Sequence, residues 1–359
     1  MNWKQLISAK RFGMEEFHEE RQENRSEFQR DYDRLIFSAP FRRLQNKTQV
    51  FPLPGSVFVH NRLTHSLEVA SVGRSLGDDV AKALLERHPE LQDSFLPEIG
   101  SIVSAACLAH DLGNPPFGHS GEKAISTFFS EGKGVRLKEK QPNGEQLSPM
   151  EWEDLTHFEG NANAFRILTH QFEGRRRGGF VLTYSTLASI VKYPFSSSLA
   201  GKKSKFGFFV SEEESYRKIA TELGLIQLSK QPLKYARHPL VYLVEAADDI
   251  CYQMMDIEDA HKLKIITTDE TKELLMAFFS EDRQSRLRST FQIVNDINEQ
   301  IAYLRSSVIG LLVRECTRVF LEHEQEILAG TFEGALIKHI AEGPAAACLL
   351  YTSPSPRDS

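Results

Sequence analysis

The stretch that decides the fold reads Ala106-Cys107-Leu108-Ala109-His110-Asp111-Leu112-Gly113-Asn114-Pro115-Pro116-Phe117-Gly118-His119. An apolar, helix-like run ends at His110-Asp111, and the chain then breaks at glycine and proline. A second histidine, His119, follows the break, and Glu122 comes three residues later. An imidazole and a carboxylate are costly to bury in a helix unless a partner or ligand binds them. We therefore expect a divalent metal here, because neutral imidazole and carboxylate are common ligands of transition metals.

The composition is that of an ordinary globular protein. The chain has 359 residues, of which 41% are hydrophobic and 26% are charged, which indicates neither disorder nor a membrane protein. No apolar run approaches the ~20 residues that span a bilayer, and the N-terminal residues lack a signal-peptide core. The 4 cysteines are scattered without a CxxC pair, which predicts reduced thiols in a cytoplasmic protein. The net charge of −6 argues against nucleic-acid binding as the main function.

Helical periodicity dominates the chain and predicts a mostly α fold. Apolar residues recur at helical spacing from about His65, and again over 239–263 and 291–328. Residues 101–110 are nearly all apolar and predict a buried helix. Residues 10–35 are rich in charged side chains and predict a solvated helical arm.

Two segments interrupt the helical pattern. Residues 131–156 are polar with proline and glycine and predict a surface loop, and two short apolar runs within 178–210 predict a small β-hairpin. The helical pattern stops near Gly343. We interpret residues 1–343 as one C-terminally truncated domain and residues 344–359 as a disordered or non-native tail.

The sequence offers further ligands for a metal at the His-Asp pair. His65 opens the long helix, and two adjacent aspartates, Asp248 and Asp249, interrupt an otherwise apolar helix, which is costly unless they are paired or bound. We choose Asp248 because Tyr252 and Asp256 follow it on one helical stripe, whereas Asp249 lies about 100° round the helix. Two histidines and two aspartates suit Mn²⁺, Fe²⁺, Co²⁺, Ni²⁺ or Zn²⁺, with Mg²⁺ less favoured. The alternative is that each is a satisfied core residue or a helix cap; the Gly-Asn-Pro-Pro break favours the metal.

A second pair follows the break. Ser120 predicts the N-cap of a new helix, which places His119 and Glu122 beside its first turn. Glu122 can orient the imidazole of His119, and an imidazole readily moves a proton near neutral pH. The alternative is a capping glutamate beside an exposed histidine.

Several basic residues lie near these motifs in the sequence. Arg62 precedes His65 by three residues and can reach the same site, and Lys192 stands before Tyr193-Pro194, where local regularity ends. Either cation suits phosphate oxygens. We interpret the runs 175–177 and 202–203 as solvated surface.

Together these residues resemble the HD superfamily of metal-dependent phosphohydrolases, whose pattern is H…HD…D. The resemblance is closer to the deoxyguanosine triphosphate triphosphohydrolases, because blocks typical of that family follow in order from about residue 30 to 260. The blocks are residues 41–51, 62–69, 110–113, 116–119, 158–162, 182–184, 192–194 and 245–250. The resemblance implies an HD-type helical bundle.

The family resemblance implies the hydrolysis of a dNTP, with dGTP preferred, to a deoxynucleoside and tripolyphosphate, by attack of water on the α-phosphorus. Mn²⁺ or Mg²⁺ is the expected cofactor, with Fe²⁺, Co²⁺, Ni²⁺ or Zn²⁺ as alternatives. The implied metal ligands are His65, His110, Asp111 and Asp248, and the implied catalytic pair is His119 and Glu122. The implied phosphate contacts are Arg62, Asn161 and Lys192, the implied sugar contact is Tyr252, and Gln49 and Asp256 match positions near the 3′-hydroxyl.

The resemblance also has departures and leaves two alternatives. Asn163 stands where the family commonly has glutamine, and the family's further C-terminal helices, with an arginine near the substrate, do not follow here. Another HD phosphohydrolase, an alarmone hydrolase or a nucleotidase, is the first alternative. A protein that binds nucleic acid through the 175–177 and 202–205 segments, with an inert metal site, is the second. The family implies a homo-oligomer and association with single-stranded nucleic acid.

Overall fold

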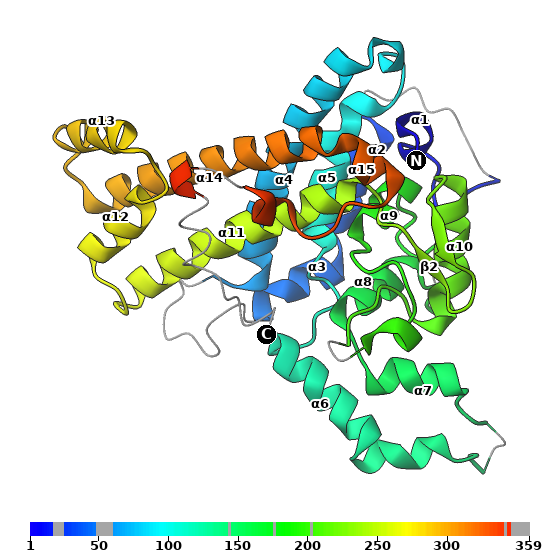
Figure 1. The fold of residues 1–359 in the computed structure, drawn as a ribbon. Coiled ribbons are helices and arrows are strands. Elements are labelled where there is room, and N and C mark those ends of the chain that lie inside the picture. Colours follow the sequence, from blue (N-terminus) through cyan, green and yellow to red (C-terminus); the bar gives the residue numbers. More distant parts are fainter. Residues whose placement is uncertain are drawn as a thin grey trace.

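A pair of closely packed helices forms the centre of the fold. The computed structural model describes residues 1–16, 25–47, 60–142, 145–174, 177–201, 204–340 and 343–345. Within them, α4 (Arg62–Arg87) packs along α5 (Ile99–Ala109), and α11 (Leu240–Lys262) and α14 (Ile297–Glu322) pack on this pair (Figure 1). The predicted mostly α fold is confirmed.

Local sequence explains where the two central helices begin and how closely they approach. α4 begins after Asn61, which forms a capping box with Thr64. α5 is buried at every residue, as its apolar sequence predicts. A Cβ on Gly77 of α4 would lie 2.6 Å from the Cα of Gly100 in α5. Because neither position carries a side chain, the backbones can approach closely there.

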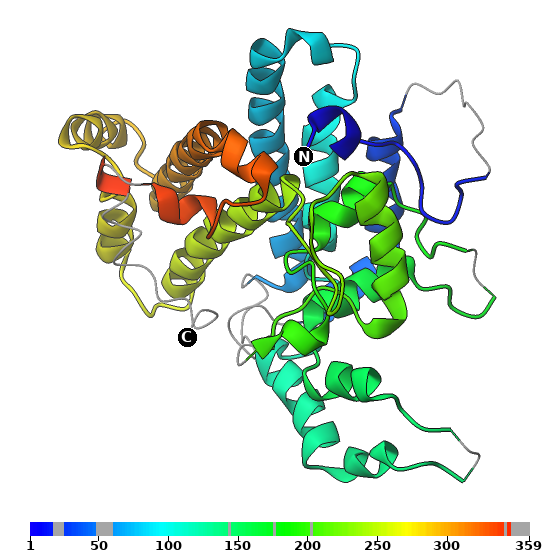
Figure 2. The same cartoon turned by 45° about the vertical axis from the view of Figure 1, so that its right-hand side comes forward.

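The remaining elements surround this centre. The other helices are α1 (Trp3–Leu6), α2 (Glu27–Ile36), α3 (Ala39–Arg43), α6 (Gly118–Ser130), α7 (Pro149–Thr156), α8 (Gly160–Thr169), α9 (Tyr184–Ile190), α10 (Glu213–Glu222), α12 (Thr268–Met276), α13 (Glu281–Phe291) and α15 (Glu324–Ala329). Two short strands, β1 (Gln227–Ser229) and β2 (Lys234–Tyr235), pair antiparallel. In two views, α6 and α7 extend from the core as one arm, and α12 and α13 extend as another (Figures 1 and 2).

The predicted hairpin at 178–210 is wrong in position, since the antiparallel pair forms at β1 and β2 instead. Thr183 is the N-cap of α9, and its side chain accepts from the Thr186 amide, so the first apolar run leads into a helix. The aromatic run that ends the segment is apolar because Phe206 and Phe209 pack into a small core with Ala162 and Ala200. Burial in a core, and not cross-strand pairing, explains its composition.

Two other boundaries differ from the sequence predictions. The predicted loop at 131–156 contains α7, which Ser148 begins through a capping box with Glu151. α6 begins at Gly118 and not after Ser120, with Phe117 as its N-cap in the left-handed conformation. Of the predicted tail at 344–359, all but Pro344 and Ala345 lie outside the described residues.

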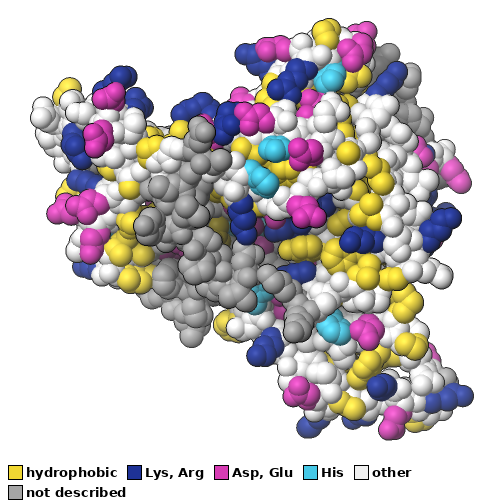
Figure 3. All heavy atoms as spheres, viewed as in Figure 1, with side chains coloured by type: hydrophobic (Ala, Val, Ile, Leu, Met, Phe, Trp, Pro, Cys, Tyr) yellow, Lys and Arg dark blue, Asp and Glu magenta, His cyan; other side chains and the backbone are white. Residues whose placement is uncertain are grey.

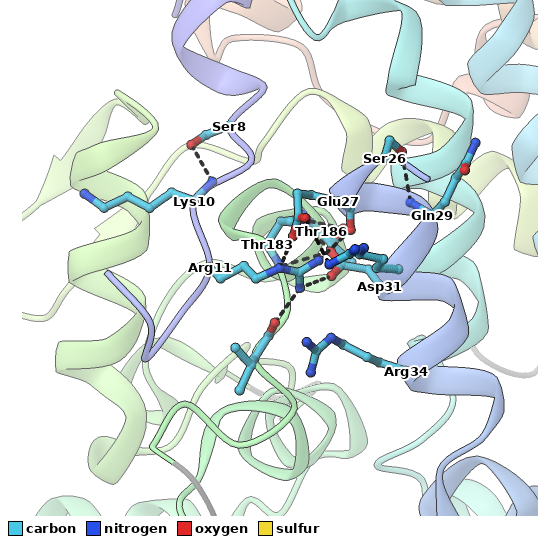
Figure 4. Close-up of polar contacts among 12 residues, drawn as sticks. Ser8, Lys10, Arg11, Ser26, Glu27, Gln29, Asp31, Arg34, Thr183 and Thr186 are labelled. Carbon is cyan, nitrogen blue, oxygen red and sulfur yellow. Dashed lines mark hydrogen bonds and ion pairs between the residues drawn. The ribbon is translucent and has the colours of Figure 1, made fainter. Parts of the chain in front are cut away.

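The predicted solvated arm at 10–35 is partly buried. Asp31 of α2 is fully buried, and Arg11 donates from Nη1 to its Oδ1 at 2.8 Å. The amide and hydroxyl of Thr183 donate to Oδ2 at 2.9 and 2.6 Å (Figure 4). This network fastens the N-terminal segment and α2 to the start of α9.

The described cysteines Cys107, Cys251 and Cys316 are buried free thiols. Among the described helices, none is both long enough and apolar enough to cross a bilayer.

Candidate active site

Three of the predicted metal ligands meet where α4 begins and α5 ends. His65 lies in the first turn of α4, His110 is the C-cap of α5, and Asp111 follows it. Their ligand atoms all lie within 4.8 Å of one another. The two imidazole rings meet edge to face, with centroids 5.4 Å apart. The burial of α5 thus places a polar cluster at the end of an apolar helix.

The fourth predicted ligand, Asp248, comes from α11, which packs against α4. Its Oδ1 lies 2.9 Å from Nε2 of His65 and 3.5 Å from Nε2 of His110. All four predicted ligands therefore lie together, although His65 and Asp248 are 183 residues apart in sequence.

The chemistry of this cluster fits a divalent cation. Nδ1 of His110 contacts the Cys107 carbonyl at 2.6 Å, which directs Nε2 at Asp111 and Asp248, 3.6 and 3.5 Å away. Nε2 is buried and has no hydrogen-bond partner among the described residues. Burial lowers the pKa of His110, but the charges of the two aspartates raise it more, to about 9. The cluster therefore favours positive charge, which a bound metal ion would supply.

Asp111 is held from both sides. Arg62 donates from Nη1 to Oδ2 at 2.7 Å, and both side chains are buried. Asn114 donates from Nδ2 to Oδ1. Such contacts fix the orientation of a ligating carboxylate. The predicted phosphate-binding residue Arg62 is thus in direct contact with a predicted metal ligand.

His119 and Glu122 form a hydrogen-bonded pair at the start of α6. Nδ1 of His119 lies 2.7 Å from Oε2 of Glu122, while the Gly160 amide donates to Oε1 at 2.8 Å. Burial raises the pKa of Glu122, but these two hydrogen bonds and the charge of Lys205 outweigh it, so the net shift is downward. Glu122 is therefore an ionised carboxylate that can hold the His119 ring, whose side chain is 52% exposed.

A tight backbone turn links this pair to the metal cluster. Phe117 and Gly118 have φ angles of 65° and 53°, in the left-handed region that favours glycine. A Cβ on Gly118 would lie 2.8 Å from Nη2 of Arg62. The start of α6 therefore packs directly on the guanidinium that contacts Asp111.

The other predicted substrate residues have acidic partners or lie farther along α11. Asn161 donates from Nδ2 to Oε1 of Glu159 at 2.8 Å, and Lys192 pairs with Glu245 at 2.7 Å. Burial lowers the pKa of Lys192, but the charge of Glu245 raises it more, so Lys192 is a cation. The predicted sugar and 3′-hydroxyl residues that the structure describes are Tyr252 and Asp256, one and two turns beyond Asp248 on α11. Gln49 lies outside the described residues.

The sequence analysis included Lys205 only in the 202–205 segment, as a nucleic-acid contact, and did not assign it to the active site. Its Nζ lies 2.8 Å from Oε1 of the buried Glu159 and 3.9 Å from Oε2 of Glu122. Lys205 is thus a cation close to the His119–Glu122 pair. The signal in the sequence was its position immediately before the aromatic run that begins at Phe206. Because Phe206 is buried, the neighbouring lysine lies close to the interior.

Comparisons with known proteins find relatives that match most of the chain. An HD domain family model matches residues 62–147, which include the whole of α4, α5 and α6. A deoxyguanosinetriphosphate triphosphohydrolase-like protein of Pseudomonas aeruginosa is 42% identical over 97% of this chain and 77% of its own length. One from Synechocystis sp. is 42% identical over 94% of this chain and 76% of its own. The deoxyguanosinetriphosphate triphosphohydrolase of Yersinia enterocolitica is 33% identical over 94% of this chain and 73% of its own. The chain therefore belongs to the deoxyguanosinetriphosphate triphosphohydrolase family of HD-domain phosphohydrolases.

Proposed function

We propose that this protein hydrolyses deoxynucleoside triphosphates, with dGTP preferred, to the deoxynucleoside and tripolyphosphate in a metal-dependent reaction. The observation that carries the proposal is the link that Arg62 makes between the two halves of the site. Its Nη1 contacts Asp111 in the metal cluster, and its Nη2 lies against Gly118, next to His119. The names of the relatives support the same substrate.

His65, His110, Asp111 and Asp248 would hold Mn²⁺ or Mg²⁺, with Fe²⁺, Co²⁺, Ni²⁺ or Zn²⁺ as alternatives. A divalent ion held by these residues would polarise a phosphoryl oxygen and activate water. Two imidazoles and two carboxylates can bind any of these ions. Coordination geometry and the availability of each metal would decide which one is bound.

In the proposed reaction, His119 would move the proton that is transferred. Water adds its oxygen to the α-phosphorus, the bond from phosphorus to the 5′-oxygen breaks, and that oxygen takes up a proton. The Glu122 carboxylate, 2.7 Å from Nδ1, orients the ring and leaves Nε2 as the nitrogen that exchanges the proton. The half-exposed position of His119 would leave Nε2 accessible to a bound nucleotide.

A triphosphate carries about four negative charges, which the metal ion and the cations of the site would have to offset together. Arg62, Lys192 and Lys205 pair with Asp111, Glu245 and Glu159 in the protein itself, so they are held in place before substrate arrives. Phosphate oxygens can share these cations, and Asn161 adds an amide donor. Tyr252 against the sugar, with Asp256 and Gln49 at the 3′-hydroxyl, would give the preference for deoxyribose.

Product analysis tests the proposal directly. Purified protein is incubated with each of the four dNTPs and Mn²⁺ or Mg²⁺, and the phosphate products are separated by ion-exchange chromatography. Tripolyphosphate, released fastest from dGTP, is the expected product, and His110→Ala or Asp111→Asn is expected to abolish its release. Orthophosphate or pyrophosphate as the product would overturn the proposal.

The same preparation tests the two alternatives. Faster hydrolysis of guanosine tetraphosphate than of dGTP would favour an alarmone hydrolase. Salt-dependent binding of single-stranded DNA without turnover would favour a nucleic-acid-binding protein. On the face shown in Figure 3, basic and acidic side chains are interspersed, which gives no support to a purely nucleic-acid-binding function. We expect a homo-oligomer in solution.

A further inference from the structure

Lys47 contacts both sides of the candidate active site. Its Nζ donates to the carbonyl of Leu112 at 3.3 Å and to that of Asn114 at 2.6 Å. Its own carbonyl accepts from the Arg62 amide at 3.1 Å. One residue therefore joins the turn that follows Asp111 to the first residue of α4.

These contacts are part of a closed ring of hydrogen bonds. Asn114 donates from its side chain to Oδ1 of Asp111 and from its amide to the Asp111 carbonyl. Arg62 donates to Oδ2 of Asp111. Each oxygen of the Asp111 carboxylate is thus reached by a residue that Lys47 itself holds, and Lys47 closes the ring opposite the carboxylate.

The local sequence leaves the carbonyls of the 112–114 turn with few backbone hydrogen-bond donors. α5 ends at Ala109, and Pro115 and Pro116 follow the turn. Because proline has no N–H, the two prolines donate no backbone hydrogen bond to the carbonyls of this turn. An ammonium supplies up to three donors at once. The position has a cost, since burial and the nearby charge of Arg62 lower the pKa of Lys47.

We propose that Lys47 is a positioning residue, which clamps the 112–114 turn to the start of α4 and thereby orients Asp111 toward the metal and Arg62 toward the triphosphate. The inference rests on the proposed function and its metal ligands. It predicts that loss of the ammonium weakens metal binding before any nucleotide is present.

The test compares Lys47→Met, which keeps the aliphatic stem, with Lys47→Arg, which keeps a charged donor. Lys218→Met is the matched control, because Lys218 on α10 pairs with Glu15 and contacts none of the ring. Mn²⁺ binding is measured by isothermal titration calorimetry without nucleotide, kcat and KM are measured with dGTP, and the unfolding midpoint is measured on the metal-free proteins.

Lys47→Met is expected to raise the Mn²⁺ Kd about tenfold or more, as loss of a group that orients a ligand typically does, and to lower kcat. Lys47→Arg is expected to recover most of the affinity, and Lys218→Met to match the wild type. An Mn²⁺ Kd for Lys47→Met within twofold of the wild type, with unchanged kcat, would overturn the inference. The inference would also fail if Lys47→Met and Lys47→Arg lowered the unfolding midpoint by the same amount while the Mn²⁺ Kd of both stayed at the wild-type value.

Two further outcomes separate this inference from the proposed function. If the wild type binds Mn²⁺ but releases no tripolyphosphate, the proposed function fails, and the Kd comparison still decides the role of Lys47. If the wild type binds no Mn²⁺, the metal ligands and the inference fail together. Should Lys47→Met not fold, Lys47→Gln takes its place; its neutral amide, with two N–H donors on a shorter side chain, predicts a smaller rise in the Mn²⁺ Kd, and an unchanged Kd contradicts the inference.

Discussion

Nη1 of Arg62 lies 2.7 Å from Oδ2 of Asp111, and both side chains are buried. This contact joins the residue proposed to bind phosphate to a residue proposed to bind the metal. Removing one partner of a buried ion pair leaves the other charge without compensation, which typically costs about 3–5 kcal/mol. We therefore expect stability and ligand binding to be coupled at this pair.

We predict that Arg62→Met lowers the free energy of unfolding by about 3 kcal/mol in the metal-free protein, as measured by urea denaturation. Saturating Mn²⁺ is expected to reduce this loss, because a cation beside Asp111 replaces the missing guanidinium. Arg25→Met is the control, since the Arg25–Asp33 pair is exposed and such pairs contribute only about 0–1 kcal/mol. Equal losses in the two variants would contradict the coupling.

The His119–Glu122 pair predicts a different pattern of effects. His119→Gln is expected to lower kcat by roughly 10²–10⁴-fold, the range for loss of a general acid or base, with the Mn²⁺ Kd unchanged. His110→Ala is expected to weaken Mn²⁺ binding as well. Calorimetry with Mn²⁺ and steady-state kinetics on the two variants separate these effects. A His119→Gln protein that keeps its kcat would exclude His119 from the chemistry.

His60 forms a charge cluster that the sequence analysis did not anticipate, in which His60 and Asp259 are buried and Glu68 is exposed. Its Nδ1 lies 2.7 Å from Oδ1 of Asp259 on α11, and its Nε2 lies 3.2 Å from Oε1 of Glu68 on α4. The His60 amide also donates to Oδ2 of Asp259 at 3.2 Å. Burial lowers the pKa of His60, but the two carboxylates raise it more, from 6.5 to about 9.

The raised pKa predicts how stability depends on pH. Because the folded-state pKa lies above the unfolded value, the stabilisation is fully present below about pH 6.5 and is lost as pH rises through about 9. A shift of this size corresponds to roughly 3 kcal/mol. Urea unfolding at pH 6 and pH 10 should show a larger loss in the wild type than in His60→Gln. The same pH dependence in both proteins would assign the effect to other groups.

Short-range patterns in the sequence were enough to predict most of the fold and the centre of the site. Helical spacing predicted α4 and α11, and a nearly all-apolar run predicted α5. The packing of these helices brings His65, His110, Asp111 and Asp248 together. The sequence also contains the capping box of Ser148 and Glu151, which indicates a helix start. The prediction of a loop over 131–156 was wrong because the polar residues, proline and glycine of this segment outweighed that local pattern.

Long-range contacts could not be predicted in this way. Lys47 reaches Asn114 across 67 residues, and Lys205 reaches Glu159 across 46. No periodicity links such positions, because each contact depends on how three or more helices pack. The hairpin prediction failed for the same reason, since an aromatic run has the same composition in a strand and in a small core.

Gly118 offers a final test of the link between the two halves of the site. Alanine at this position would be strained by the φ of 53°, and its Cβ would also press on Nη2 of Arg62 at 2.8 Å. Gly174→Ala is the matched control, because Gly174 has a φ of 71° and a Cβ there meets no described atom within 4 Å. Both variants are expected to lose about 1 kcal/mol from backbone strain. Only Gly118→Ala should displace the guanidinium and so raise the Mn²⁺ Kd and lower kcat/KM. Equal kinetics and metal affinity in the two variants would show that the start of α6 does not position Arg62.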